Sequence, residues 1–315
     1  KKYPVEYDFM LNTWYPKLRV ADISVERSER KLSVNEAKEV LQSNPSQLSL
    51  DDIYMIALTY EKGSKEWDEI ILFAVENYPQ SPEARVNAAN VAMANGDYAA
   101  AEQYLQSLPA DMPEAINSRG ILAMAQGDYN KALEYELKAL ELYEKVVGLE
   151  HSDTATSNDN IGSVYSCLGN YDKALEFHFK ALEIQEKVLG AEHPDTATSY
   201  NNIGSAYDNL GDYDKALEFH FKALDIRERV LGIEHRHTAT SYNNIGGIYD
   251  RLGDYDKALE YYFKGLDIYE KVLGTEHPYT VISYNNIADA YEALGEAEKA
   301  AEYREKAENK QTREG

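Results

Sequence analysis

The chain has 315 residues, 43% of them apolar, with a formal net charge of −23 and one cysteine. A single cysteine excludes an intrachain disulfide. No apolar run reaches the roughly 18 residues that a membrane-spanning helix needs. Residues 51–315 hold 24 basic and 48 acidic residues, a net charge of −24. Because this acidic field repels phosphate backbones, we expect no nucleic-acid partner and favour partners with basic or neutral surfaces.

The N-terminal segment, residues 1–32, shows no helical period, and its mixture of aromatic, proline and alternating apolar residues predicts an extended or irregular structure. The chain begins at Lys1 without an initiator methionine, so we expect that an upstream segment has been removed. Ser33 then opens a short predicted helix with a capping box to Glu36, and Pro45 closes it.

Residues 33–112 contain weak helical hairpins that we interpret as degenerate repeats. One covers 48–78 with its turn at Gly63, and another covers 81–108 around the turn Gly96-Asp97-Tyr98. Glycine after a helix adopts positive φ without a side-chain clash, and the aspartate that follows it can cap the next helix. The same turn signal becomes stronger further along the chain.

The regular part of the chain, residues 113–315, is built on a 42-residue period. Three consecutive blocks are nearly copies of one another: 151–192, 193–234 and 235–276. The first and second agree at 31 of 42 positions, as do the second and third. A partial fourth block covers 277–315, and a hairpin at 113–147 shares the pattern, although Arg119 stands where its successors carry isoleucine. Such a period indicates a solenoid of stacked units, about seven hairpins in all.

The middle block shows what each unit is. Its first half places apolar residues at spacings of 3, 4 and 3, up to a break at Gly211. Asp212 follows as an N-cap, and a second, longer apolar stripe ends at Gly232. We therefore expect helices near 195–210 and 213–230 and their equivalents 42 residues away. An 18-residue second helix would be about 27 Å long.

These residues resemble the tetratricopeptide repeat. The matching positions are Tyr200, Ile203-Gly204, Tyr207, Gly211-Asp212-Tyr213, Ala216 and Ala223. The 42-residue period and the Leu-Gly-x-Glu-His-Pro linker are closest to the repeats of kinesin light chains and their bacterial relatives. The resemblance implies an all-α fold, a right-handed superhelix. Residues 15–57 also resemble the start of the repeat-bearing tail of Bacteroidetes envelope proteins associated with fimbriae, which favours the envelope or periplasm over the cytoplasm.

A polar stripe runs beside the apolar stripe on the predicted first helix of each block. The four stripes supply the candidate residues Thr156, Asp159, Asn160, Ser163, Thr198, Asn201, Asn202, Ser205, Asp208, Thr240, Asn243, Asn244, Asp250, Arg251, Asn285, Asn286 and Asp289. In tetratricopeptide folds this face lines the concave groove, so the resemblance implies a solvent-open ladder of amides. An amide both donates and accepts hydrogen bonds, which suits a peptide backbone. Alternatively, some amides bridge adjacent repeats, particularly Asn160, Asn202, Asn244 and Asn286.

Four histidines recur at the 42-residue period: His151, His193, His235 and His277. Equivalent atoms of stacked hairpins lie roughly 10 Å or more apart, too far to share one metal ion. Because each histidine precedes a predicted helix start, we expect it to cap the helix or pack in the loop. His178 and His220 lie on the second-helix stripe where Tyr262 replaces them, which predicts a packing role.

The sequence therefore predicts a non-catalytic scaffold that binds a partner protein or extended peptide in the groove of residues 151–292. It contains no Gly-x-Ser-x-Gly elbow, Gly-rich phosphate loop or Cys/His zinc motif, so we expect no catalytic, cofactor or metal site. The alternative is a structural role, as a spacer or oligomerisation arm of an envelope or fimbrial assembly. In that case the groove would bind no ligand.

Overall fold

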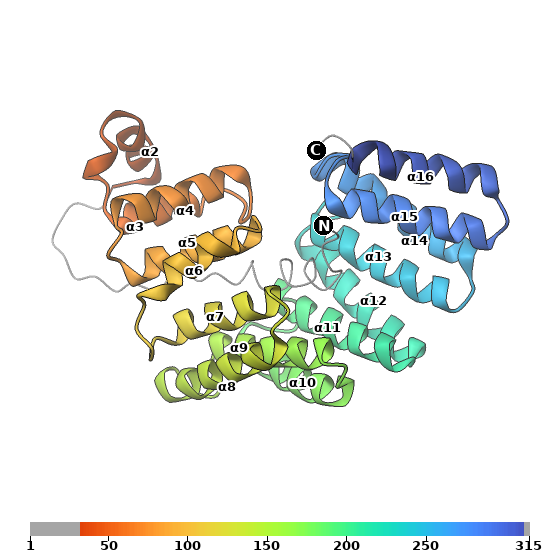
Figure 1. Cartoon of the computed structure of the whole chain (residues 1–315), viewed down its shortest axis with the longest axis horizontal. Helices are drawn as coiled ribbons and strands as arrows, with labels where there is room; N and C mark the ends of the chain where they lie inside the picture. The colour runs from red at the N-terminus through yellow and green to blue at the C-terminus, as the bar shows by residue number, and fades with distance from the viewer. Residues whose placement is uncertain (1–31, 312–315) are drawn as a thin grey trace. The chain divides into compact units, whose positions relative to one another are not determined.

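The computed structural model describes residues 32–311, and all regular elements within that range are helices (Figure 1). The expected irregular segment at 1–32 lies outside the described residues, except for its last residue. The chain divides into two compact units, Lys1–Val146 and Val147–Gly315. This division lies one hairpin after the change from degenerate to regular repeats at residue 113.

Unit 1 consists of a leading helix and three hairpins. Its elements are α2 (Val34–Ser43), the 3-10 turn η2 (Pro45–Gln47), α3 (Leu50–Ala57), α4 (Lys65–Asn77), α5 (Pro82–Ala94), α6 (Tyr98–Gln106), α7 (Pro113–Ala125) and α8 (Tyr129–Val146). The predicted capping box is confirmed, because Ser33 accepts the N–H of Glu36 and the Glu36 carboxylate accepts the N–H of Ser33. The predicted turn at Gly63 is also confirmed, with φ of 79°.

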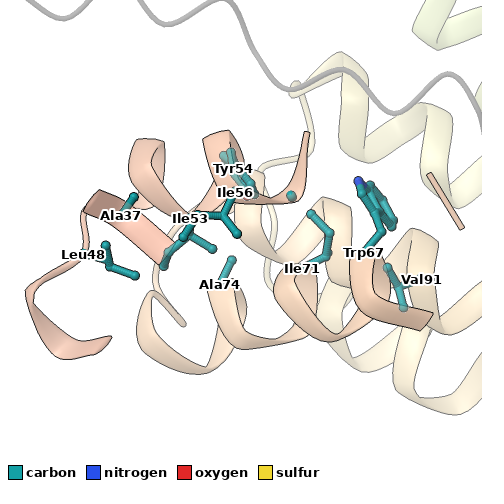
Figure 2. Packing of buried hydrophobic residues seen from close by; sticks show 10 residues of the cluster. Ala37, Leu48, Ile53, Tyr54, Ile56, Trp67, Ile71, Ala74 and Val91 are labelled. Atoms are coloured by element: carbon teal, nitrogen blue, oxygen red, sulfur yellow. The ribbon is translucent and has the colours of Figure 1, made fainter. Parts of the chain in front are cut away.

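The start of unit 1 is held together by an apolar core that α2, α3, α4 and α5 share. Figure 2 shows Trp67, Ile71 and Ala74 of α4 among the side chains of this cluster, with Val91 of α5 at one end. Ile53 of α3 is fully buried there. Burying a large apolar side chain contributes roughly 1.5–3 kcal/mol, so these degenerate hairpins still have a substantial core of their own.

Unit 2 consists of four hairpins. Its helices are α9 (Ser152–Cys167), α10 (Tyr171–Val188), α11 (Pro194–Leu210), α12 (Tyr213–Val230), α13 (Arg236–Arg251), α14 (Tyr255–Val272), α15 (Pro278–Ala293) and α16 (Ala297–Gln311). The helices predicted near 195–210 and 213–230 are confirmed as α11 and α12. Together with unit 1, the described residues form seven hairpins, the number expected from the sequence. Within unit 2 each hairpin packs on the next, and the first helices lie side by side.

The turns of unit 2 form for the local reasons that the sequence indicated. Gly211 ends α11 in the left-handed region with φ of 77°, and the Asp212 side chain accepts the N–H of Lys215 at the start of α12. At the start of α11, Nδ1 of His193 accepts the N–H of Asp195 at 3.1 Å. His151, His235 and His277 cap their helices in the same way at 3.1–3.2 Å, so the predicted capping role is confirmed.

The two helices of a hairpin approach closely where a glycine of the first faces a bulky residue of the second. A Cβ atom on Gly204 would lie 2.9 Å from the ring of His220, and one on Gly246 would lie 2.7 Å from the ring of Tyr262. His178 packs over Gly162 in the same way. The predicted packing role of His178 and His220 is therefore confirmed, and each is 1% exposed.

Candidate functional site

The candidate residues all lie on the first helices of unit 2, α9, α11, α13 and α15. The expectation that this stripe is open to solvent is wrong for one part of it, because five of its side chains are buried: Asp159, Asn160, Ser163, Asn201 and Asn202. Most of the others are half-buried, and Arg251 and Asp289 are exposed. The stripe therefore has a buried N-terminal half on α9 and α11 and a more accessible half on α13 and α15.

The position that recurs as Asp159, Asn201, Asn243 and Asn285 connects each first helix with its surroundings. The Asp159 carboxylate accepts hydrogen bonds from Nδ1 of His178 at 3.0 Å and from the Ser199 hydroxyl at 2.6 Å. His178 belongs to the same hairpin and Ser199 to the next one. A fully buried carboxylate needs such partners, because an unpaired charge in the interior is unfavourable by several kcal/mol. Asp159 therefore braces two hairpins.

Asn201 makes the equivalent brace one repeat later. Its Oδ1 accepts from Nδ1 of His220 at 3.2 Å and from Nδ2 of Asn244 at 2.9 Å. Burial lowers the pKa of His220 to about 3, and the positive charges of Arg227 and Arg251 add to the effect. His220 is therefore neutral at physiological pH, and its Nδ1–H donates to the amide oxygen. The bond from Asn244 is the bridge between repeats that the alternative interpretation of the amides predicted.

The same position is more exposed further along the array. Asn243 accepts from the Ser283 hydroxyl at 3.2 Å, and Asn285 accepts from Arg304 at 2.9 Å. Both side chains are half-buried, and each uses one amide N–H on a carbonyl of its own helix. An amide with one donor and one lone pair in use still has one of each available for a ligand.

The neighbouring position recurs as Asn160, Asn202, Asn244 and Asn286. Asn202 is 1% exposed, and among the described residues neither its amide oxygen nor its amide nitrogen has a hydrogen-bond partner. Asn286 is half-buried and makes no hydrogen bond through its side chain within residues 32–311. Of these amides, the one on α15 is the best placed to receive a ligand.

The hydroxyl groups of the stripe are mostly engaged by their own helices. Thr156, Thr198 and Thr240 donate to carbonyl oxygens four residues earlier, and Ser205 donates to the carbonyl of Asn201. Such a hydroxyl retains its acceptor capacity, so it can receive an N–H from a ligand without losing its internal bond.

Acidic residues dominate the C-terminal ends of the first helices. Asp208 of α11 pairs with Arg251 of α13, and Asp289 of α15 pairs with Arg304. Asp250 is half-buried and has no ion pair in the described part of the chain. Its pKa is raised because burial disfavours the charged form and because Asp289 is nearby, whereas Arg251 opposes the shift. This end of the stripe therefore favours cations.

The second helices also contribute arginine side chains that contact the first helices, and these contacts were not predicted from the sequence. Arg304 of α16 contacts Asn285, Asp289 and Glu292, and it adds a basic residue that the predicted stripe on the first helices did not include. Arg227 of α12 is buried and donates to the Ser241 hydroxyl at 2.8 Å, and burial lowers its pKa to about 10. Their positions on the apolar stripe of the second helices were the available signal.

The described residues contain no group of three or more His, Cys, Asp or Glu side chains that could hold a metal ion. None of the helices formed by these residues has both the length and the hydropathy of a membrane-spanning segment. The interactions of the candidate surface are hydrogen bonds and ion pairs, and they suit recognition of another polar chain.

Comparisons with solved structures support this fold. One structure contains the nearly identical TPR-like repeats of a kinesin light chain from Podosopora anserina. It matches with a TM-score of 0.54 and 24% identity, over 64% of this chain and 97% of that one. BtubC (BKLC) from P. vanneervenii matches with a TM-score of 0.56 and 24% identity, over 76% and 91%. A STAND protein with a tetratricopeptide repeat sensor from Pyrococcus horikoshii matches with a TM-score of 0.65 and 18% identity, over 85% and 42%. At these identities the likeness shows the fold.

Comparison with family models is more specific. A tetratricopeptide repeat model matches residues 111–187, 158–229, 209–271 and 251–311, and a second one matches 73–123. No curated protein sequence matches the chain. Tetratricopeptide repeats generally serve as non-catalytic scaffolds for protein–protein interaction. Because the first model alone covers more than half of the sequence, the chain belongs to the tetratricopeptide repeat family.

Proposed function

We propose that unit 2 binds an extended peptide segment of a partner protein along its first helices α9, α11, α13 and α15. The observation that carries this proposal is a pair of half-buried polar groups without a partner in residues 32–311, the Asn286 amide and the Asp250 carboxylate. Because both side chains are only half-buried, water can reach them, and the polar groups of a bound peptide can replace that water as hydrogen-bond partners.

The chemistry of the two groups indicates what kind of peptide fits. The amide of Asn286 can donate to a peptide carbonyl and accept from a peptide N–H, which requires no particular side chain. Asp250 favours a lysine or arginine side chain, because a cation would offset both its partial burial and the repulsion from Asp289. The net charge of −24 over residues 51–315 acts in the same direction. We therefore infer an extended, basic partner segment.

The test uses peptides selected by phage display against the full chain, with affinity measured by fluorescence anisotropy. Asn286→Ala should weaken binding about 2- to 13-fold, which corresponds to roughly 0.5–1.5 kcal/mol for one neutral hydrogen bond. Asp250→Asn should weaken peptides that contain lysine or arginine and leave neutral peptides nearly unchanged. Asn130→Ala, at an exposed asparagine of α8 in unit 1, is the matched control and should change nothing. Unchanged affinity in both groove variants would refute the proposal.

A spacer function is the second candidate, and the buried braces at Asp159 and Asn201 favour it. If the amides serve only to hold the hairpins together, replacing Asn201, Asn243 and Asn285 with alanine lowers the melting temperature and leaves peptide affinity unchanged. If the groove binds a peptide, the same triple variant loses affinity as well. Because Asn201 is 3% exposed and accepts two hydrogen bonds, we expect a loss of stability in both cases, so affinity decides between them.

A further inference from the structure

Unit 1 contains a pocket of about 390 Å³ between α6, α7 and α8, and none of its lining residues belongs to the groove of unit 2. Its floor is apolar and consists of Leu105, Leu122 and Ala123, and its rim includes Glu102, Gln126, Lys131 and Tyr135. Pockets that bind small organic groups begin at about 300 Å³. The size is therefore sufficient for one aromatic side chain and the backbone that carries it.

The 42-residue register explains why this pocket exists. Ala123 stands at the position that the next four hairpins fill with a tyrosine: Tyr165, Tyr207, Tyr249 and Tyr291. In each of those hairpins the tyrosine ring stacks on an aromatic ring of the second helix, with centroids 5.6–6.0 Å apart. A lysine ammonium lies over the tyrosine ring at 4.8–5.0 Å from its centroid.

The α7/α8 hairpin keeps the other two members of this arrangement. Tyr135 occupies the position of Phe177, the stacking partner of Tyr165, and Lys131 occupies the position of Lys173. Within residues 32–311 the Tyr135 ring stacks on no other ring, and Lys131 makes no ion pair. The Lys131 ammonium instead lies 5.9 Å from the centroid of Tyr135. The stacking surface and the cation are present, and the ring between them is missing.

The polar rim also differs from that of the following hairpins. Arg119 replaces isoleucine and donates to the carbonyls of Leu105 and Leu108 at 2.8 and 3.0 Å, which fixes the end of α6 as one wall of the pocket. Glu102 and Gln126 are exposed at the mouth and can bond to a polar atom of a bound group. A tyrosine combines a planar ring with such a polar atom.

We propose that this pocket is a docking site for a tyrosine side chain of a partner protein, which takes the place that the chain's own tyrosine holds in the following hairpins. The ring stacks on Tyr135 beneath the Lys131 ammonium, and the hydroxyl group reaches the rim at Glu102 or Gln126. Stacking and cation–π contacts favour an aromatic ring over a saturated one of the same size. The site is independent of the peptide groove in unit 2.

The test uses p-cresol, the side-chain analogue of tyrosine, with the full chain labelled on leucine and isoleucine methyl groups for NMR. We expect saturable shifts of the Leu105 and Leu122 methyl signals, with a dissociation constant on the order of a few millimolar. The saturated analogue 4-methylcyclohexanol should bind at least about fivefold more weakly, because it cannot stack. Equal binding of the two probes, or unmoved Leu105 and Leu122 signals, would overturn the proposal.

Substitutions test whether p-cresol binds in the space that the absent tyrosine ring at position 123 leaves. Ala123→Tyr should fill the pocket from within and abolish the p-cresol shifts. Tyr165→Ala should open an equivalent pocket in the α9/α10 hairpin and add shifts at the Ile161 methyl group. Tyr135→Leu should weaken binding about tenfold, and Lys131→Met about threefold, which keeps the proposal testable if Ala123→Tyr does not fold. Undiminished p-cresol binding in a folded Ala123→Tyr variant would contradict the assignment.

Discussion

Acidification should destabilise unit 2 through its buried histidines, and His220 allows the effect to be worked out. An unfolded histidine has a pKa of about 6.5, whereas burial between α11 and α12 lowers the pKa of His220 to about 3. Between these values the unfolded chain binds a proton that the folded chain does not. The contribution of His220 to the free energy of unfolding is therefore at its maximum above about pH 6.5, and it decreases as the pH falls toward 3.

The magnitude follows from the two pKa values. Full protonation of the unfolded state against a neutral folded state changes the free energy of unfolding by about 1.4 kcal/mol per pH unit. From pH 7 to pH 5 the loss attributable to His220 is therefore about 2 kcal/mol. His237 and His277 shift in the same direction, because burial lowers the pKa of both, that of His277 to about 4.

The matched control comes from the next hairpin. Tyr262 replaces the histidine there and packs over Gly246, so His220→Tyr removes the titrating group while keeping a ring of similar shape over Gly204. Urea unfolding followed by far-UV circular dichroism at pH 7 and pH 5 should show about 2 kcal/mol less loss in the variant. Tryptophan fluorescence provides an internal reference, because both tryptophans fall in residues 1–146, which contain no histidine. An equal loss of stability in the two proteins would refute the assignment to His220.

Two further predictions concern packing within unit 2. Gly204→Ala should destabilise it by about 1–3 kcal/mol because the new Cβ would lie 2.9 Å from the ring of His220, whereas Gly247→Ala, with its nearest contact at 3.7 Å, should be neutral or stabilising. Denaturant titration compares the two, and equal effects would contradict the close-packing argument. Deleting 277–315 should uncover Leu259 and Leu266 of α14 and cause aggregation measurable by light scattering. Deleting only 309–315 should scarcely change the melting temperature, and small effects from both deletions would refute the argument that α15 and α16 cover the apolar side of α14.

Much of the fold could be predicted because its signals are local. A hairpin turn requires a residue that tolerates positive φ followed by one that caps a helix, and Gly211-Asp212 supplies both within two positions. The histidine caps act on the N–H two residues further on, so their role also follows from nearby sequence. The 42-residue period then predicts the remaining hairpins of unit 2.

The exposure of the candidate site residues could not be predicted from the sequence, because it depends on contacts with residues far along the chain. Asn201 and Asn243 hold equivalent positions in nearly identical blocks, yet only Asn201 is buried. His220 and Asn244, 19 and 43 residues away, both bond to its oxygen. At Asn243 the residue equivalent to His220 is Tyr262, and the one equivalent to Asn244 is Asn286, whose amide makes no such bond.

The pocket in unit 1 shows the same division between sequence and structure. Alignment of the repeats reveals that Ala123 lacks the tyrosine ring of its successors, and the sequence alone determines that difference. Whether the missing ring leaves a space depends on α6, whose residues form the opposite wall. Local geometry is set by neighbours within about four residues, whereas the filling of a gap is set by side chains from other helices, so only the tertiary structure could decide it.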